Sequence, residues 1–247
     1  MKSQFLIGAA IAMALTATAG AYAKPTPAQL AAVADKARPE ADTKRDDARK
    51  PAEMLDFAGV KPGQTVVDLI PGGGYFTRIF SKAVGEKGTV YAVSGPARPG
   101  STPAQDTIAA DANYSNVKSI HAALAGGLSI PTQADLVWTS QNYHDVKNVP
   151  NIDMLAFDKA IFNSLKPGGV FIVLDHVANA DTANATSTVH RIDPAVVKKE
   201  VEAAGFKFEG ESKVLANPAD DHKGRSTDDG PLRGHTDQFI YKFRKPK

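Results

Sequence analysis

The chain has 247 residues, 43% hydrophobic and 23% charged, which is typical of a soluble globular protein with enough residues for one large core. It contains no cysteine, which excludes disulfides, thiolate metal ligands and a cysteine nucleophile. The formal net charge is only +2, so the chain lacks the basic surface that binds nucleic acid.

The first 23 residues have the pattern of a signal peptide. Lys2 supplies a short positive region, an apolar stretch follows over residues 5–15, and Ala21-Tyr-Ala23 matches the A-x-A cleavage pattern. An uncleaved membrane anchor is the alternative, but the apolar stretch is short for a span of about 20 residues. We therefore expect cleavage before Lys24 and a protein that is periplasmic or secreted, without stable membrane insertion.

Residues 24–50 are expected to form a charged helical arm. Thr26 can cap a short helix that runs to about Lys36. Residues 38–50 form a dense charged run, which is typical of a helix that faces water. Pro51 then opens another helix.

Residues 51–247 predict one α/β domain. Apolar runs expected as strands lie at 65–70, 89–93, 117–124, 135–139, 170–174, 206–215 and 238–243. Helical patterns lie at 75–84, 104–112, 153–165 and 194–204. This alternation indicates a mostly parallel sheet with helices on both faces, and the last two runs indicate an antiparallel pair. A long polar loop is expected at 217–236.

The strongest local pattern is a glycine-rich turn after the first buried strand, in Val66-Val-Asp-Leu-Ile-Pro-Gly-Gly-Gly-Tyr-Phe-Thr77. A helix starts directly after it, so a ligand can approach the backbone and meet the N–H groups of the helix N-terminus. A tight turn that serves only the fold is the alternative. The place of the turn in the alternating pattern favours a ligand site.

This turn resembles the first motif of the class I S-adenosylmethionine-dependent methyltransferases, Asp-x-Gly-x-Gly-x-Gly. Asp68, Gly72 and Gly74 match it, whereas Ile70 replaces the first glycine. The resemblance continues at residues 133–140, 165–174 and 201–206, which look like the family's fourth strand, its turn and fifth strand, and the helix end before its sixth strand. The turn, residues 142–145 and 190–193, and the ending from residue 233 look similar to an exported group of predicted methyltransferases.

The resemblance implies a Rossmann-like methyltransferase fold with a mostly parallel seven-stranded sheet and an antiparallel last strand. It also implies a small-molecule substrate and S-adenosyl-L-methionine as the cofactor. The residues that it places around this methyl donor are Asp68, Gly72, Gly73, Gly74, Tyr75, Ser94, Ser140 and Asn142.

Ser94 departs from the wider family, in which an acidic residue ends the second strand and accepts hydrogen bonds from both ribose hydroxyls. A serine can bond one hydroxyl but lacks the charged, two-oxygen acceptor. Adenosine binding is therefore expected to be weakened or rearranged.

Polar side chains crowd the end of the expected fourth strand, in Ser140-Gln-Asn-Tyr-His-Asp145. His144 is a candidate general base, because it titrates near neutral pH, and Asp145 or another acid would orient it. His176, at the end of the neighbouring strand, is the third candidate catalytic residue. A surface loop whose side chains only satisfy backbone groups is the alternative.

Further His and Asp residues are expected on the same side of the sheet. His190 and Asp193 should loop over it, and three His with three Asp could converge as metal ligands. Their spacing matches no metal motif, so no metal is assigned. Arg191 could bind an anion or pair with Asp193, and residues 220–222 are expected in a solvated loop. His121 is expected to be structural.

Two functions remain open. One is a methyltransferase in which His144 removes a proton as a substrate oxygen or nitrogen attacks the methyl group. The other is a methyltransferase fold that has lost the donor and binds or transforms another small molecule in the His/Asp-rich crevice. Ile70 and Ser94 favour the second hypothesis, and the retained Asp68 and glycines favour the first.

Overall fold

The computed structural model describes residues 24–123, 128–227, 232 and 234–247. The predicted signal peptide, residues 1–23, lies outside the described residues. In the part of the chain that is described, no helix is both long and apolar enough to cross a membrane.

A seven-stranded sheet forms the centre of the domain, with the strand order β3-β2-β1-β4-β5-β7-β6. The strands are β1 (Thr65–Leu69), β2 (Thr89–Ser94), β3 (Val117–His121), β4 (Ala134–Ser140), β5 (Leu165–His176), β6 (Lys207–Ser212) and β7 (Gln238–Arg244). The first five strands pair in parallel, and β7 is antiparallel to both β5 and β6. The predicted Rossmann-like sheet is confirmed.

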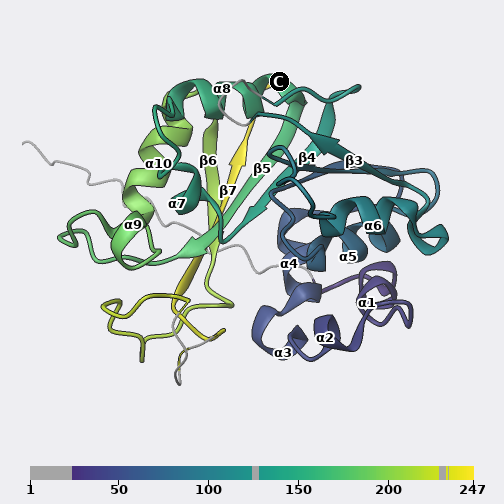
Figure 1. Ribbon diagram of the computed structural model, residues 1–247, viewed down its shortest axis with the longest axis horizontal. Coiled ribbons are helices and arrows are strands. Elements are labelled where there is room, and N and C mark those ends of the chain that lie inside the picture. Colours follow the sequence, from purple (N-terminus) through teal and green to yellow (C-terminus); the bar gives the residue numbers. More distant parts are fainter. Residues whose placement is uncertain (1–23, 124–127, 228–231, 233) are drawn as a thin grey trace, which may run out of the picture.

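Helices cover both faces of the sheet (Figure 1). Val66 of β1 packs in a core with α4 (Pro51–Ala58), α5 (Tyr75–Val84) and α6 (Ala104–Ala110). The next residue, Val67, points to the other core, which contains side chains of α7 (Tyr143–Val146), α8 (Met154–Ser164) and α10 (Pro194–Ala203). Because successive strand residues face opposite sides, strands buried on both faces are apolar throughout, as the sequence predicted.

The arm consists of three short helices that pack beside α5: α1 (Pro27–Val33), α2 (Glu40–Thr43) and α3 (Asp46–Arg49) (Figure 1). Thr26 caps α1 as predicted, accepting from the backbone N–H of Gln29 at 3.3 Å. The prediction that the charged run faces water is wrong for part of it, since only 5% of Arg38 and 8% of Asp42 are exposed. Their charges are compensated instead by ion pairs, Arg38 with Asp46 and Asp42 with Arg78.

The strand order reverses between β1 and β4, because β2 lies on one side of this pair and β5 on the other. In open α/β sheets, ligands bind outside the carboxyl ends of the strands at such a switch point. The glycine-rich turn follows β1 and the polar segment follows β4, so the topology places both at this point.

Candidate active site

The glycine-rich turn holds Ile70, which replaces the first glycine of the motif, in a backbone conformation that favours glycine. Ile70 has a φ of 59°, in the left-handed region that favours glycine. A side chain there costs roughly 1–2 kcal/mol. Its carbonyl accepts a hydrogen bond from Asn142 Nδ2 at 2.9 Å, which joins the ends of β1 and β4. The replacement of the first glycine therefore does not prevent a left-handed backbone conformation at this position.

The three glycines of the turn have different surroundings. A Cβ atom added at Gly72 or Gly73 would meet no other atom within 4 Å, so both face open space. At Gly74 it would lie 2.1 Å from Cδ1 of Ile108. Gly74 is therefore required for the packing of α6 against the turn, and Gly72 and Gly73 are the positions that a ligand can approach.

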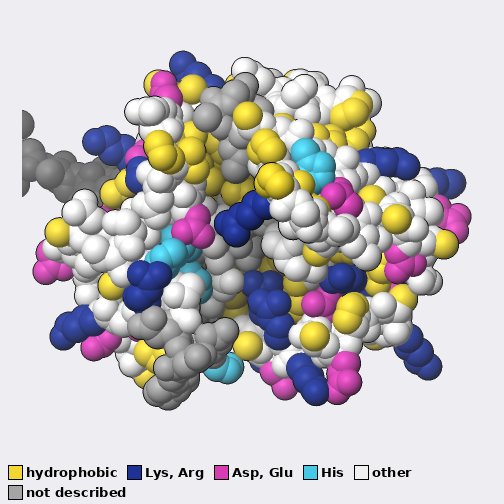
Figure 2. All heavy atoms as spheres, in the orientation of Figure 1, with side chains coloured by type: hydrophobic (Ala, Val, Ile, Leu, Met, Phe, Trp, Pro, Cys, Tyr) yellow, Lys and Arg dark blue, Asp and Glu magenta, His cyan; other side chains and the backbone are white. Residues whose placement is uncertain are grey.

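A cavity of about 210 Å³ lies over the turn. Of the predicted donor-binding residues, those that line it are Asp68, Gly72, Gly73, Tyr75, Ser140 and Asn142. The arm contributes Arg45 and Arg49. Ser94 does not line the cavity, and its hydroxyl donates to the carbonyl of Gly95 at 3.0 Å. Figure 2 shows Lys and Arg side chains in the hollow at the middle of this face.

Asp68 is a buried acid at the floor of the cavity, and 3% of the residue is exposed. Burial raises its pKa to about 6, against the lowering effect of the hydrogen bond that Thr77 Oγ1 donates at 2.6 Å and of the charge of Arg49. The carboxylate therefore holds the first turn of α5 to the end of β1.

Arg49 is a half-buried cation in the cavity wall. Its guanidinium carbon lies 4.7 Å from the ring centre of Tyr75 and 5.3 Å from that of Phe76. Burial, together with the charge of Arg45, lowers its pKa to about 10, so it stays protonated at neutral pH. Among the described residues no carboxylate forms an ion pair with it, and its side-chain acceptor is Gln141 Oε1 at 2.8 Å. The wall thus offers a positive charge to an anionic ligand group.

Arg45 and Arg49 were not among the site residues predicted from the sequence. Both belong to the charged run, whose composition is the same whether it faces water or a cavity. Only the folding of the arm back onto α5 distinguishes the two cases.

His144 and Asp175 form the centre of the second part of the site, at the ends of β4 and β5. His144 Nδ1 and Asp175 Oδ1 are 2.7 Å apart, and the backbone N–H of His144 donates to Asp175 Oδ2 at 2.9 Å. The N–H of His176 donates to Asp175 Oδ1 at 2.8 Å. Asp175 is fully buried, and it is the acid that orients His144.

Asp145 lies on the other side of His144. Its Oδ1 is 3.3 Å from His144 Nε2 and 3.2 Å from His190 Nδ1. Burial lowers the pKa of His144, but hydrogen bonds with Asp145 and Asp175 outweigh this effect and raise it to about 9. At neutral pH both ring nitrogens of this imidazole therefore carry a proton, and the ring is positively charged. It can act as a base only at higher pH, or when a metal ion has displaced one of these protons.

His176 lies beside His144, with ring centres 5.9 Å apart, so the two do not face opposite sides of the sheet. Burial lowers the pKa of His176 to about 4, and its Nδ1 lies 2.6 Å from the hydroxyl of Thr236. Asp193, expected in the same group, instead caps α10 by accepting from the N–H of Ala195 at 2.8 Å. The catalytic roles of His144, Asp145 and His176 remain predictions.

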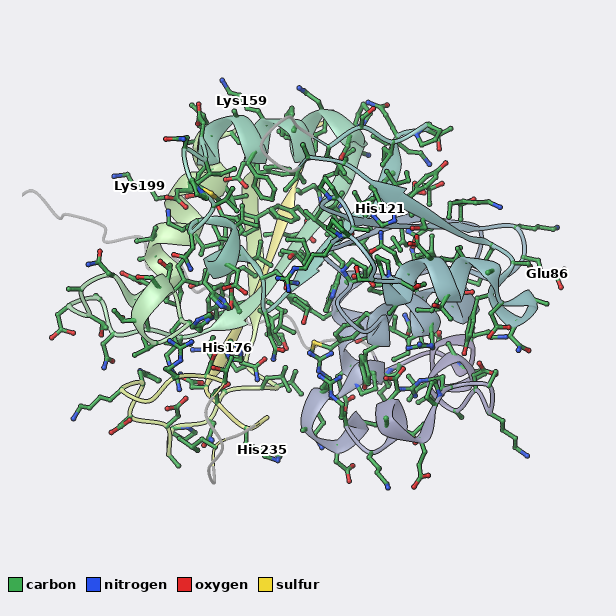
Figure 3. The ribbon with its side chains drawn as sticks, viewed as in Figure 1. Glu86, His121, Lys159, His176, Lys199 and His235 are labelled. Atoms are coloured by element: carbon green, nitrogen blue, oxygen red, sulfur yellow. The ribbon has the colours of Figure 1, made fainter. Side chains whose placement is uncertain are left out.

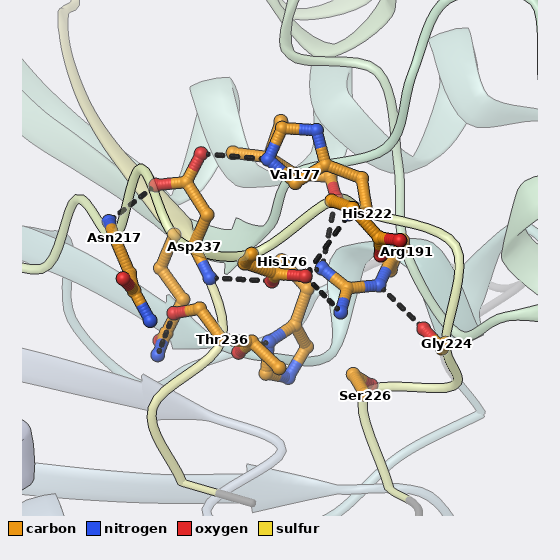
Figure 4. A network of polar contacts seen from close by, with 12 residues as sticks. His176, Val177, Arg191, Asn217, His222, Gly224, Ser226, Thr236 and Asp237 are labelled. Atoms are coloured by element: carbon orange, nitrogen blue, oxygen red, sulfur yellow. Dashed lines mark hydrogen bonds and ion pairs between the residues drawn. The ribbon is translucent and has the colours of Figure 1, made fainter. Parts of the chain in front are cut away.

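Arg191 is the centre of a structural network (Figure 4). It forms two hydrogen bonds with Asp220, at 2.8 and 3.1 Å, and donates through Nε to the carbonyl of Gly224 at 2.8 Å. The expectations that Arg191 binds an anion or pairs with Asp193, and that Asp220 is solvated, are therefore wrong. The network fastens the loop after β6 to the end of β5.

Two further histidines, His222 and His121, lie outside the group. His222 sits between Asn179 and Asp237, at 3.0 and 2.9 Å, within the Arg191 network. His121 ends β3 and pairs with Asp106 at 2.8 Å, far from His176 in Figure 3.

A profile of the ubiE/COQ5 methyltransferase family matches residues 46–187, more than half of the chain. The chain belongs to this family. A search of curated proteins gave no match. Residues 24–45 of the arm and everything after residue 187, His190 included, lie outside the matched segment.

Solved structures share the fold of this family member. A SAM-dependent methyltransferase from Aquifex aeolicus is 19% identical with a TM-score of 0.56, over 85% of this chain and 95% of that one. An arsenic (III) S-adenosylmethionine methyltransferase from Chlamydomonas reinhardtii is 20% identical with a TM-score of 0.53, over 90% and 74%. A TehB-like SAM-dependent methyltransferase from Corynebacterium glutamicum is 14% identical with a TM-score of 0.53, over 81% and 86%.

Family membership implies S-adenosylmethionine as the methyl donor, and the residues present fit it. Gly72 and Gly73 leave open space above the turn, and Arg49 offers a cation for the donor's carboxylate. The one feature that does not fit is Ser94, which supplies no charged acceptor for the ribose.

Proposed function

We propose that this methyltransferase transfers a methyl group to an oxygen or nitrogen of a small molecule bound beside His144. The observation that supports this proposal is the adjacency of the two parts of the site. Asn142 lines the donor cavity, and His144 follows two residues later in α7. Donor and acceptor would thus meet at the end of β4.

The donor would lie over Gly72 and Gly73, with its carboxylate toward Arg49. When bound, it supplies an electrophilic methyl group and leaves as a neutral thioether. Arg49 is held by the rings of Tyr75 and Phe76 and by Gln141, so it is oriented before the donor arrives. Such alignment is the main requirement of methyl transfer.

The acceptor would be held by the histidine group. Asp175 fixes the orientation of His144, and Asp145 and His176 flank it. The neutral His176 and the charged His144 give the acceptor two different polar contacts. The acceptor's proton would leave through this group to solvent, because Asp145 is half exposed.

The alternative, a fold that has lost its donor, rests on Ile70 and Ser94. Ile70 gives this alternative little support, because the residue adopts a left-handed backbone conformation that a glycine would also adopt. Ser94 alone argues for weaker ribose binding rather than for no donor.

We also propose that residues 1–23 are removed on export and that the mature protein acts in the periplasm or outside the cell. The A-x-A pattern before Lys24 supports this proposal. S-adenosylmethionine is made in the cytosol, so an exported enzyme would need a supply of this donor outside the cytosol.

Calorimetry of S-adenosylmethionine with residues 24–247, with and without added divalent metal, tests the proposed function. We expect one donor molecule to bind per chain. If a folded protein binds neither this donor nor S-adenosylhomocysteine, the donor-loss alternative takes its place.

A further inference from the structure

The side chains of His144, Asp145 and His190 bring three donor atoms to one point on the surface of the site. These atoms, two imidazole nitrogens and one carboxylate oxygen, all lie within 4.8 Å of one another. We propose that the three residues form a binding site for a divalent transition-metal ion, with zinc as the best match. Two histidines and one carboxylate are a common ligand set for such ions.

The distances support this proposal. Asp145 Oδ1 lies 3.3 Å from His144 Nε2 and 3.2 Å from His190 Nδ1. A tetrahedral zinc ion with bonds of about 2.0–2.1 Å separates its ligand atoms by about 3.4 Å. Both distances are close to this spacing, and the remaining pair of ligand atoms lies within 4.8 Å.

Asp175 supplies the outer support that such sites use. A metal-binding histidine usually donates its other ring N–H to a carboxylate, which fixes the ring and its tautomer. Asp175 takes this position on Nδ1 of His144, at 2.7 Å. With Nδ1 as the donor to Asp175, a metal ion would take the place of the proton on Nε2, between this nitrogen and Asp145. The carboxylate is itself held by two backbone N–H groups.

His190 is held at the site at the cost of backbone strain. Its φ is 50°, in the left-handed region that side chains rarely adopt. Its carbonyl accepts from Ser226 Oγ at 2.8 Å, and the next residue, Arg191, is fixed by its pair with Asp220. Because His190 lies beyond residue 187, the family match does not include this ligand.

Three protein ligands leave at least one coordination position open, as in catalytic rather than structural zinc sites. The side chain of Asp145 is 51% exposed, so solvent and small molecules reach this side. If the proposed methyl transfer holds, the open position would take the acceptor's nucleophilic atom and polarise it. This role rests on the proposed function, whereas the metal site does not.

Metal binding can be measured without donor or acceptor. Residues 24–247 are freed of metal with a chelator, then titrated with Zn²⁺ by calorimetry and with Co²⁺ by its visible absorption. We expect one ion per chain, and a Co²⁺ spectrum of a site with fewer than six ligands. Binding of less than a stoichiometric amount at micromolar Zn²⁺ would overturn the proposal.

Variants locate the ion. His190→Ala should weaken Zn²⁺ binding by about 100-fold or more, since it removes a ligand, and Asp175→Asn should weaken it by about 10–100-fold. His121→Ala is the matched control, because it removes a histidine that also pairs with an aspartate but has no third ligand in the described cluster. Circular dichroism checks that each variant is folded. If Asp175→Asn does not fold, His190→Ala decides alone, and equal affinity in this variant and the parent refutes the site. Loss of metal binding with intact donor binding would leave the proposed function standing.

Discussion

Arg49 donates a hydrogen bond to Gln141, 92 residues further along the chain, and Gln141 donates in turn to Gln238 at 2.9 Å. This chain of three side chains joins the arm, the end of β4 and the start of β7. Gln141 has a φ of 60°, so the backbone after β4 is strained at the residue that makes both bonds. Through this chain and through Arg45 and Arg49, the arm forms part of the wall of the cavity over the glycine-rich turn.

Arg49→Gln should weaken S-adenosylmethionine binding by about 10–100-fold, since a hydrogen bond to a charged group contributes roughly 1.5–3 kcal/mol. Calorimetry on residues 24–247 measures the affinity. Arg49→Lys keeps the charge and should lose less, and Lys159→Gln, on the exposed side of α8, should lose nothing. Equal affinity of Arg49→Gln and the parent would show that the donor's carboxylate lies elsewhere.

Replacements of neighbouring glycines should separate ligand contact from packing. Gly73→Val enters open space without backbone strain, so the protein should keep its melting temperature and lose donor binding. Gly74→Val meets Ile108 and requires a φ near 78°, so it should lower the free energy of unfolding by about 2–5 kcal/mol. Thermal unfolding and donor calorimetry on both variants make the comparison. If Gly73→Val binds the donor as tightly as the parent does, the donor does not lie over this turn.

The sheet could be predicted from sequence because its pattern is local. The helix at 75–84 was predicted with the bounds of α5, and the expected strand at 65–70 exceeds β1 by one residue. The proximity of His144 and His176 was also predicted, since parallel strands end at the same edge of a sheet, and their ring centres are 5.9 Å apart. The resemblance contributed the identity of the donor.

What the sequence could not show are pairings across long separations. Nothing local indicates that Arg191 pairs with Asp220, which is far along the chain, rather than with the nearby Asp193. Nor does the motif reveal that Gly74 packs against Ile108, whereas Gly73 faces open space. These outcomes depend on how α6 and the loop after β6 pack onto the rest of the domain.

Asp68 should make stability depend on pH. Its folded pKa of about 6 lies above the ordinary value of about 3.9, so the unfolded chain loses this proton first as pH rises. Stability then falls by about 3 kcal/mol between roughly pH 4 and 6 and stays level above. Asp68→Asn should lack this fall while its amide oxygen still accepts from Thr77.

The measurement is the free energy of unfolding of Asp68→Asn minus that of the parent, from pH 4 to 7. This difference should rise by about 3 kcal/mol over the range. Asp47→Asn, which removes an exposed carboxylate, is the control for loss of charge. A difference that does not change with pH would mean that Asp68 ionises equally in both states.

Export predicts a defined N-terminus. Mass spectrometry of protein from the envelope fraction should show a chain that begins at Lys24, and Ala23→Arg should block cleavage by removing the small residue before the cut. Ala28→Arg, beyond the pattern, should still be cut. An intact Met1 on protein from the cytosol would contradict export and restore an ordinary supply of donor.

The ion pair of Arg191 and Asp220 should be a structural requirement rather than an anion site. Both side chains are almost fully buried, so Asp220→Ala leaves an uncompensated cation and should lower the free energy of unfolding by about 3–5 kcal/mol. Arg191→Met with Asp220→Ala removes both charges and should cost less than these two single changes added together, because the two effects are coupled. Denaturant unfolding of the parent, the two single variants and the double variant measures this coupling, and strictly additive losses would mean that the two residues act independently.

The ion pair of Arg191 and Asp220 should also affect the proposed metal site, since Arg191 holds its neighbour His190 beside Asp145. Asp220→Ala should therefore also weaken binding of Zn²⁺ at temperatures where it is still folded, whereas an equally destabilising change in the opposite core, Ile79→Ala, should not.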